Sequence, residues 1–313
     1  MSLAFVFPGQ GSQAVGMGQA LAEAFPVARH TLQEVDDALG QHLSRVMFEG
    51  PEEELRLTAN AQPALMAVSL AALRVLEQEG GKPMAERAAF VAGHSLGEYS
   101  ALAAAGALEL ADAAVLLRRR GQAMQEAVPV GQGAMAALLG LDLEVAQGIA
   151  EAAAEDQVCA AANDNAPGQV VLSGHSEAID RAIALAQERG AKRAILLPVS
   201  APFHCALMAP AADVMADALA AVSIKMPSVP LIANVTAARL SDSDEIRRKL
   251  VEQVTGMVRW RESVAFMASQ GVEKTVELGA GKVLTGLTKQ IDRDLVGVAA
   301  GTPEEMEKLL QQL

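Results

Sequence analysis

Aromatic side chains, cysteine and basic charge are all scarce in this sequence. Aromatic residues make up 3% of the 313 residues, so a core must be built from Leu, Val, Ile, Met and Ala. The two cysteines, Cys159 and Cys205, have neither metal-site spacing nor the pattern of a secreted disulfide framework, which suits a reducing compartment. The net charge of −13 argues against a general nucleic-acid binder and against an anionic membrane surface as a partner.

Two kinds of apolar segment are also missing. The first residues carry no basic n-region and meet Pro8 too early for a signal peptide. No apolar run approaches the roughly 20 residues that a membrane-spanning helix needs. We therefore expect a cytoplasmic protein with no nucleic-acid or membrane partner. Because no stretch shows an exposed apolar seam, we also expect a monomer.

The order of apolar runs and helical patterns predicts an α/β protein with an inserted subdomain. Strands that alternate with helices are expected at residues 3–7, 88–92, 231–235 and 272–278. Between residues 134 and 199 the order is strand, helix, strand, strand, helix, strand, with a loop at 163–168, which is the ferredoxin-like signature. The expected division is an α/β-hydrolase-like large subdomain, residues 1–128 and 200–313, and a ferredoxin-like small subdomain, residues 129–199.

A Gly-x-Ser-x-Gly motif at residues 93–97 stands between an apolar strand and a strong helix former. This arrangement predicts a nucleophile elbow that presents the hydroxyl of Ser95. The positive end of the following helix would favour negative charge beside that oxygen. The alternative is a serine that only caps the helix, but a cap does not need both glycines.

A serine nucleophile needs a base, and the sequence offers five histidines: His30, His42, His94, His175 and His204. The first two lie in polar helical stretches, and His175 is better explained as a capping residue. His94 is too close in sequence to reach the Ser95 hydroxyl, but it is well placed to line a pocket. His204 follows a strand end where the small subdomain rejoins the large one, so we favour it as the base.

One arginine of the run at residues 118–120 falls on an apolar helix face. At about 100° per residue, Arg120 lies among the apolar side chains of residues 113–124, whereas Arg118 and Arg119 point away. Burying an unpaired guanidinium is costly, so Arg120 must meet an anion. A substrate carboxylate or an internal Asp or Glu would both serve.

Two glycine-rich loops resemble nucleotide-binding motifs, and we reject both. Residues 7–14 match Gly-x-Gly-x-x-Ala, but the acidic residue expected after a second strand is absent. We expect this loop to bring a backbone N–H near Ser95 as an oxyanion donor. Residues 279–283 lack the Ser or Thr that follows Lys in a phosphate-binding loop, so a structural turn is the better interpretation.

Taken together, the motifs resemble those of the malonyl-CoA:acyl-carrier-protein transacylases of bacterial type II fatty-acid synthesis. The resemblance runs nearly from end to end. It rests on residues 7–13 (FPGQGSQ), 93–99 (GHSLGEY), 120–121 (RG), 163–169 (NDNAPGQ), 203–204 (FH) and 279–286 (GAGKVLTG).

The resemblance implies an acyltransferase that needs no cofactor and no metal, with malonyl-CoA and acyl carrier protein as partners. Ser95 would take the malonyl group as an ester, and His204 would act as base and then as acid. Arg120 would bind the free malonyl carboxylate. The backbone N–H groups of Gln10 and Leu96 would form the oxyanion hole.

Four further residues match family positions. Gln253 corresponds to the glutamine whose backbone carbonyl holds the histidine tautomer in place of a triad aspartate. His94 and Asn165 match supporting pocket positions. Phe203 resembles the pattern that prefers malonyl over methylmalonyl groups, because a bulky ring would crowd a 2-methyl branch.

Two other functions remain open at this point. A serine esterase or thioesterase would use water as acceptor, would place a carboxylate near His204 and would not need Arg120. A non-catalytic scaffold would keep Ser95 and His204 for structural reasons only. For a transacylase, docking of an acidic carrier protein needs local positive charge, and the candidate contributors are Arg189, Lys192, Arg193 and Lys282.

Overall fold

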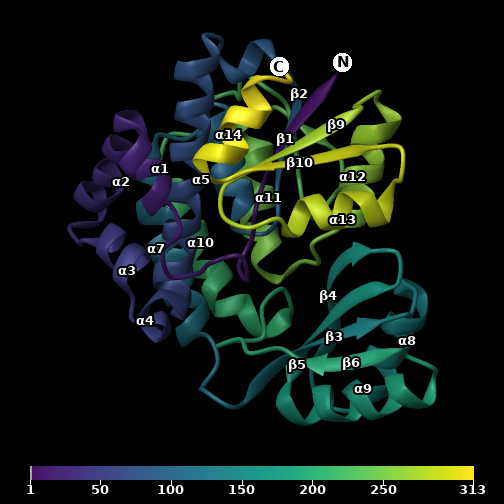
Figure 1. Ribbon diagram of the computed structural model, residues 1–313. Helices are drawn as coiled ribbons and strands as arrows, with labels where there is room; N and C mark the ends of the chain where they lie inside the picture. Colours follow the sequence, from purple (N-terminus) through teal and green to yellow (C-terminus); the bar gives the residue numbers. More distant parts are fainter. Residues whose placement is uncertain (1) are drawn as a thin grey trace.

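The computed structural model describes residues 2–313, and the strands form two sheets (Figure 1). The larger sheet has the order β10-β9-β1-β2-β7-β8, with parallel neighbours except for the antiparallel pair of β7 and β8. Its strands are β1 (Leu3–Phe7), β2 (Ala88–Gly93), β7 (Leu231–Ile232), β8 (Arg239–Leu240), β9 (Lys274–Leu278) and β10 (Val296–Ala300). Three of the four predicted strands of this part are close in extent, but the predicted strand at 231–235 ends at Ile232.

Helices cover both faces of the larger sheet because alternate residues of its buried strands point to opposite sides. In β1, Phe5 and Phe7 pack into one apolar core, whereas Ala4 and Val6 pack into a second core. The first core is formed with α1 (Gln19–Ala24), α2 (Pro26–Leu39), α3 (Leu43–Glu49), α5 (Thr58–Gly80), α6 (Gly97–Ala104), α7 (Leu110–Glu126), α10 (Ala209–Ala220) and α11 (Ser243–Thr255). The second core is formed with α12 (Trp260–Ser269) and α13 (Val283–Ile291).

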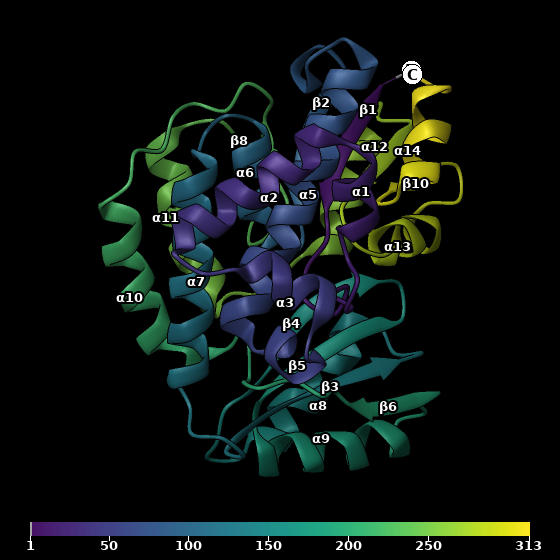
Figure 2. The ribbon, with the colours of Figure 1, turned by 60° about the vertical axis from the view of Figure 1, so that its left-hand side comes forward.

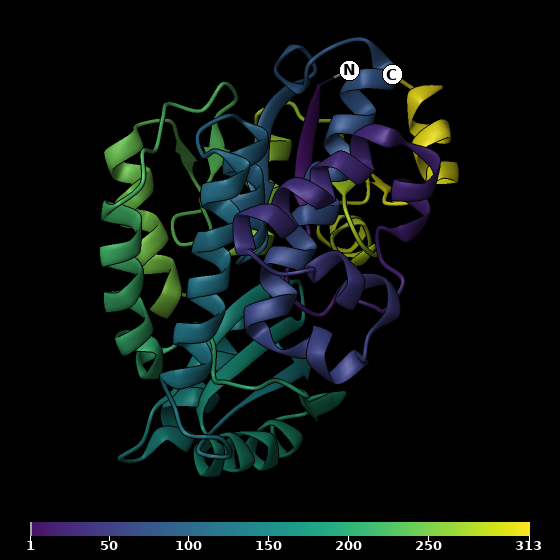
Figure 3. The ribbon, with the colours of Figure 1, turned by 90° about the vertical axis from the view of Figure 1, so that its left-hand side faces the viewer.

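The long helix α5 corrects one sequence-based expectation. An 18-residue window of α5 has a mean hydropathy of 1.2, so the helix is long and apolar enough to cross a membrane by length and composition. Within the fold, 89% of that window is buried. The helix lies between α2 and α7, which explains why it is apolar on nearly every side. Figures 2 and 3 show α7 and α10 standing beside each other on the same flank.

The smaller sheet is formed by one continuous stretch and has the order β4-β5-β3-β6, with antiparallel neighbours throughout. Its elements are β3 (Gly133–Leu139), α8 (Leu143–Ala154), β4 (Cys159–Ala166), β5 (Gln169–His175), α9 (Ser176–Glu188) and β6 (Arg193–Leu196). The two helices pack on one face and enclose a separate apolar core. Figure 1 shows this sheet on the opposite side of the molecule from the start of β1 and the C-terminal helix α14 (Pro303–Leu310).

The predicted loop at residues 163–168 is wrong for its first four residues, since β4 continues to Ala166. Asn and Asp usually favour turns, but here the backbone N–H of Asp164 donates to the carbonyl of Val258 in the large part at 2.9 Å. The N–H of Val258 donates in turn to Ala162 at 2.9 Å. Pairing between distant segments therefore overrides the local preference. Only Pro167 and Gly168 form the turn, with Gly168 at φ +71°.

The remaining elements are short or lie near the chain end. The short helix α4 (Glu52–Arg56) lies before α5, and α12, α14 and β10 were not predicted from the sequence. Two single-turn 3₁₀ helices occupy Met84–Glu86 and Ala206–Met208. The second of these turns follows His204 and leads into α10.

Candidate active site

Ser95 lies at the carboxyl end of β2 in a strained turn. Its φ of +54° is in the left-handed region, which a residue with a side chain rarely adopts. Both glycines of the motif are required by close approach of backbone atoms. A Cβ on Gly93 would collide with the carbonyl of Gly97, and a Cβ on Gly97 would collide with the carbonyl of Phe7. The motif therefore allows β2, the turn and α6 to pass close enough to expose the serine hydroxyl.

Asn234, which sequence reasoning missed, fixes this turn through two side-chain hydrogen bonds. Its Oδ1 accepts a hydrogen bond from the Ser95 N–H at 2.7 Å, and its Nδ2 donates to the Gly93 carbonyl at 2.7 Å. The side chain is fully buried. Its position just after β7, at the carboxyl end of the strand beside β2, is the signal that could have identified it.

His204 is positioned to take the Ser95 proton. Its Nε2 lies 2.8 Å from Ser95 Oγ, and its Nδ1 lies 2.9 Å from the Gln253 carbonyl and 3.1 Å from the Gly256 carbonyl. Since carbonyl oxygens only accept, Nδ1 carries the hydrogen and Nε2 is the acceptor. Burial and then the charge of Arg120 lower the pKa of His204 to about 3, so the ring is neutral near pH 7.

The hydrogen-bond partners of His204 Nδ1 distinguish this site from that of an ordinary serine esterase. Among the residues that the structure describes, both acceptors at this nitrogen are backbone carbonyls and neither is a carboxylate. The triad carboxylate expected of an ordinary serine esterase is therefore not at this position.

Arg120 is buried beside the nucleophile with only neutral oxygens as partners. Its Nη1 donates to Gln62 Oε1 at 2.8 Å, and its Nη2 donates to Ser95 Oγ at 3.1 Å and to Gln253 Oε1 at 2.8 Å. The residue is 1% exposed, and its Nε has no hydrogen-bond partner. Burial lowers the pKa of Arg120 from its usual value. No ion pair within 4 Å neutralises this guanidinium in residues 2–313, so the site can accept an external carboxylate.

Gln253 connects several parts of the site with its side chain as well as its backbone. Its Nε2 donates to the Ser95 carbonyl at 2.9 Å and to Glu98 Oε2 at 2.8 Å. Its Oε1 accepts from Arg120. The sequence suggested only the backbone contact to His204, because an amide in a helical pattern does not reveal what its side chain reaches.

Gln10 and Leu96 lie on the pocket wall next to Ser95. Within the described chain, neither backbone N–H donates to a protein acceptor. Leu96 is the N-cap residue of α6, where the helix dipole favours negative charge. The side chain of Gln10 donates to Thr58 Oγ1 at 3.3 Å, and Thr58 in turn contacts Ser200 Oγ at 2.9 Å. Two unused N–H groups beside a serine suit an oxyanion.

His94 and Asn165 meet across the junction between the two sheets. His94 Nε2 lies 2.8 Å from Asn165 Oδ1, so this nitrogen carries the hydrogen and donates. The His94 ring also lies 5.7 Å from the ring of Trp260, measured between centroids. Burial lowers the pKa of His94.

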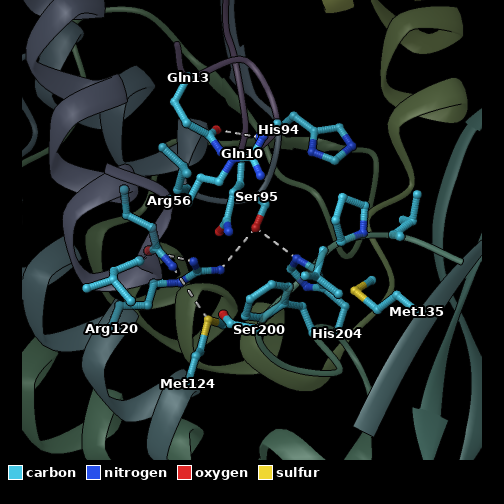
Figure 4. Close-up of a pocket in the computed structure, with 18 of the residues that line it drawn as sticks. Gln10, Gln13, Arg56, His94, Ser95, Arg120, Met124, Met135, Ser200 and His204 are labelled. Atoms are coloured by element: carbon cyan, nitrogen blue, oxygen red, sulfur yellow. Dashed lines mark hydrogen bonds between the residues drawn. The ribbon is translucent and has the colours of Figure 1, made fainter. Parts of the chain in front are cut away.

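The site opens into a pocket of about 610 Å³. Figure 4 shows Ser95 between His204 and Arg120 within it. Phe203, which is 8% exposed, and His94 also line the pocket, whereas Gln253 and Asn165 act from behind its wall. His30, His42 and His175 do not line it. Within residues 2–313, no three His, Cys, Asp or Glu side chains are grouped so that they could hold a metal ion.

The four basic residues considered for docking differ in availability. Arg189, Lys192 and Arg193 are exposed at the end of α9 and the start of β6. Lys282 is also exposed, but its Nζ lies 2.8 Å from Glu305 Oε1. Lys282 is therefore partly neutralised by an acidic neighbour.

Comparison with known proteins gives consistent results. The family model described as "Acyl transferase domain" matches residues 4–299. The malonyl CoA-acyl carrier protein transacylase of Escherichia coli (strain K12) is 50% identical over 308 residues, which cover 98% of each chain. The enzyme of the same name from Bacillus subtilis (strain 168) is 47% identical over 312 residues, which cover 99% of this chain and 97% of the relative.

Solved structures agree with these sequence relatives. The acyl-carrier-protein-S-malonyltransferase from Bartonella henselae superposes with a TM-score of 0.97 at 55% identity and covers 100% of this chain and 99% of that one. A malonyl-transacylase in complex with its type II PKS acyl-carrier protein superposes with a TM-score of 0.97 at 44% identity, with 100% of both chains covered.

Proposed function

The chain belongs to the acyl transferase family, among the malonyl-CoA:acyl-carrier-protein transacylases, and we propose how its residues carry out the transfer. It moves the malonyl group from malonyl-CoA to the thiol of acyl carrier protein and so supplies fatty-acid synthesis. The observation that carries the proposed mechanism is the position of Ser95 Oγ, 2.8 Å from His204 Nε2 and 3.1 Å from Arg120 Nη2. A nucleophile, its base and a carboxylate-binding group thus meet at one atom.

In the first half-reaction, Ser95 Oγ attacks the thioester carbonyl while its proton passes to His204 Nε2. The carbonyl oxygen becomes an oxyanion, which the N–H groups of Gln10 and Leu96 stabilise. Collapse of this intermediate breaks the carbon–sulfur bond, and the CoA sulfur takes the proton from His204. The Gln253 carbonyl holds the histidine in the required tautomer throughout.

In the second half-reaction, the pantetheine thiol of the carrier protein gives its proton to His204 and attacks the malonyl ester. Ser95 then leaves and takes the same proton. No redox change or metal chemistry enters either step, so we propose that the enzyme needs no cofactor. CoA enters only as the leaving group of the substrate.

Arg120 supplies the preference for an acyl group with a free carboxylate. A malonyl carboxylate pairs with the buried guanidinium, whereas an acetyl group leaves that charge unpaired. The negative charge also offsets the effect of Arg120 on His204, whose pKa Arg120 lowers. Binding of malonyl therefore makes the base stronger as it places the substrate. Phe203 at the pocket wall is proposed to exclude a 2-methyl branch.

His94 and Asn165 support the pocket wall. Their hydrogen bond joins the turn before Ser95 to β4 of the small sheet. We propose that this contact fixes the position of the small sheet relative to Ser95. The part of the pocket wall that meets the malonyl group then keeps its shape.

The carrier protein is proposed to approach along β6. Arg189, Lys192 and Arg193 supply positive charge there, and Ile195 and Leu196 are 43% and 55% exposed beside them. The segment that follows β6, residues 197–200, lines the active-site pocket. An acidic carrier protein bound at this edge would therefore direct its pantetheine arm into the site.

We also propose a division of the chain into two subdomains. The antiparallel order β4-β5-β3-β6 supports a ferredoxin-like small subdomain at residues 129–199. The mainly parallel larger sheet with a nucleophile elbow supports an α/β-hydrolase-like subdomain at residues 1–128 and 200–313. We further propose that the protein is cytoplasmic and that it is a monomer. Size-exclusion chromatography with light scattering would test the monomeric state.

Intact-mass measurement tests the mechanism in two stages. Incubation with malonyl-CoA should add one malonyl group, located on Ser95 by peptide mapping, and pantetheinylated carrier protein should then remove it. Release of free malonate without carrier protein would instead indicate a hydrolase. Absence of both adduct and turnover would leave only a scaffold.

A further inference from the structure

A buried carboxylate lies directly beneath the proposed nucleophile and has no part in the mechanism above. Glu98, in the first turn of α6, is 1% exposed. Its Oε2 accepts hydrogen bonds from Gln253 Nε2 at 2.8 Å and from the Asn234 N–H at 3.1 Å. Since burying a charged carboxylate is costly, its presence at this point requires a physical reason.

One of these two hydrogen bonds leads to the nucleophile. Asn234, whose N–H contacts Glu98, binds the Ser95 N–H and the Gly93 carbonyl with its side chain. The other bond leads to the base and the carboxylate-binding group, because Gln253 contacts both His204 and Arg120. Glu98 thus adds a buried link between the two halves of the site, beside the direct contacts of Gln253 and Arg120 with Ser95.

Glu98 and Arg120 are the opposite charges of this buried cluster. They do not touch directly, because the Gln253 amide lies between them, with Oε1 toward Arg120 and Nε2 toward Glu98. Arg120 is the cation that faces Glu98 from α7. Among the other titratable groups nearby, Tyr99 on α6 has its pKa raised to about 12 and His204 has its pKa lowered to about 3, so both are neutral near pH 7.

The elements packed around Glu98 bring no second buried charge beside it, because Arg120 is the only charged residue of α7 that is buried and α11 has none. β1 and β2 contain no titratable side chain, and neither does α5 between Thr58 and Leu73. In the empty site, the pair of Glu98 and Arg120 is therefore close to neutral when Glu98 is ionised. A malonyl carboxylate that binds Arg120 adds a second negative charge to the same buried volume.

We propose that Glu98 is a positioning residue and the internal counter-ion of Arg120, and that it takes up a proton from solvent when the malonyl carboxylate replaces it in this role. The inference rests on the proposed function of Arg120 as the carboxylate-binding group. Two carboxylates that share one buried cation cannot both stay ionised at neutral pH without a large cost. The more deeply buried one is protonated.

The geometry permits this proton without loss of the network. Both hydrogen bonds to Glu98 use Oε2, and no described residue donates to Oε1. A proton on Oε1 leaves the contacts to Gln253 and Asn234 in place, so the site keeps its shape in both charge states. In support, burial raises the pKa of Glu98 to about 7 in the empty site. Near neutral pH a further negative charge nearby therefore shifts Glu98 toward its protonated form.

Isothermal titration calorimetry of a Ser95→Ala variant tests the proposal, since this variant can bind malonyl-CoA but cannot accept the acyl group. Titrations in phosphate and in Tris at about pH 7.5 separate proton uptake from binding heat. We expect uptake of a substantial fraction of one proton per malonyl-CoA, and almost none with acetyl-CoA. The uptake should disappear in Ser95→Ala/Glu98→Gln and persist in the surface control Ser95→Ala/Glu109→Gln.

The pH dependence identifies the group even if the Glu98 variant does not fold. A group whose pKa rises from about 7 gives the greatest uptake above pH 7, whereas His204, with a pKa of about 3, would give its greatest uptake well below pH 6. Binding without uptake, uptake that is greatest at acidic pH, or uptake that survives Glu98→Gln would overturn the inference. Failure of the Ser95→Ala protein to bind malonyl-CoA would count against the proposed function itself.

Discussion

Replacing Arg120 by methionine should convert a malonyl-selective site into one that no longer distinguishes malonyl from acetyl groups. Methionine keeps much of the side-chain length and the apolar stem of arginine. It removes the guanidinium, which lies 3.1 Å from Ser95 Oγ and whose hydrogen-bond partners in the described chain are all neutral oxygens. The change therefore acts mainly on the acyl groups that bring a carboxylate to that position.

The expected magnitude follows from the contacts that are lost. A bound malonyl carboxylate would accept two charge-assisted hydrogen bonds, at about 1.5–3 kcal/mol each. Their loss lowers kcat/KM for malonyl-CoA by roughly a hundredfold to ten-thousandfold, since about 1.4 kcal/mol corresponds to a factor of ten. Acetyl-CoA has no group that loses a partner, so its kcat/KM should stay within about tenfold.

The pH profile supplies a second readout of the same change. Arg120 lowers the pKa of His204, so its removal raises that pKa and moves the acidic limb of the loading rate toward higher pH. Rapid-quench loading of Ser95 by malonyl-CoA and acetyl-CoA, read by intact mass, measures both effects. Arg119→Met, on the exposed side of the same helix, is the matched control. An equal loss for both acyl groups in Arg120→Met would refute the assignment.

Three further changes test other parts of the structure. Gly97→Ala should abolish loading and lower Tm, because its Cβ meets the Phe7 carbonyl; Gly148→Ala in α8, where a Cβ has room, should leave loading and Tm intact or raise Tm slightly. The folded-state pKa of Glu98, about 7, lies above its ordinary value, so the stability that it contributes is present below about pH 4.5 and is lost as pH rises through 7. Between about pH 4.5 and 7, the free energy of unfolding of the wild type, measured in urea, should fall by about 3 kcal/mol relative to that of Glu98→Gln. If the free energies of the two proteins change with pH in parallel, the raised pKa is not that of Glu98. Arg193→Glu should raise KM for carrier protein without slowing the loading of Ser95 by malonyl-CoA, whereas an equal effect on both half-reactions would exclude β6 as the docking edge.

The parts of the fold that the sequence predicted well are those with strong local signals. The elbow around Ser95 was predictable because two glycines and a strand-to-helix change coincide within a few residues. The helical face of Arg120 was predictable because a charge among apolar neighbours is conspicuous. Helix α12, by contrast, begins at Trp260 after a segment paired with the small sheet, and no local cap marks its start.

The residues that sequence reasoning missed share a different property. Asn234, Glu98 and Gln62 act through side chains that reach partners far away in the chain, as with the bond from Asn234 to Ser95. In sequence, each has the appearance of an ordinary polar residue at the edge or in the middle of an element. Only the folded chain shows that all three belong to one hydrogen-bond network around Ser95 and Arg120. Buried polar networks are non-local, so periodicity and propensity carry no information about them.

In the proposed mechanism, the selection of malonyl and the activation of the base depend on the charge of Arg120. Burial and then the charge of Arg120 keep the pKa of His204 low in the empty pocket, and a weakly basic histidine accepts the Ser95 proton less readily. A malonyl carboxylate offsets that charge, whereas an acetyl group does not. Discrimination should therefore appear in the rate of acyl transfer from bound thioester as well as in binding, because the wrong substrate leaves the base unprepared.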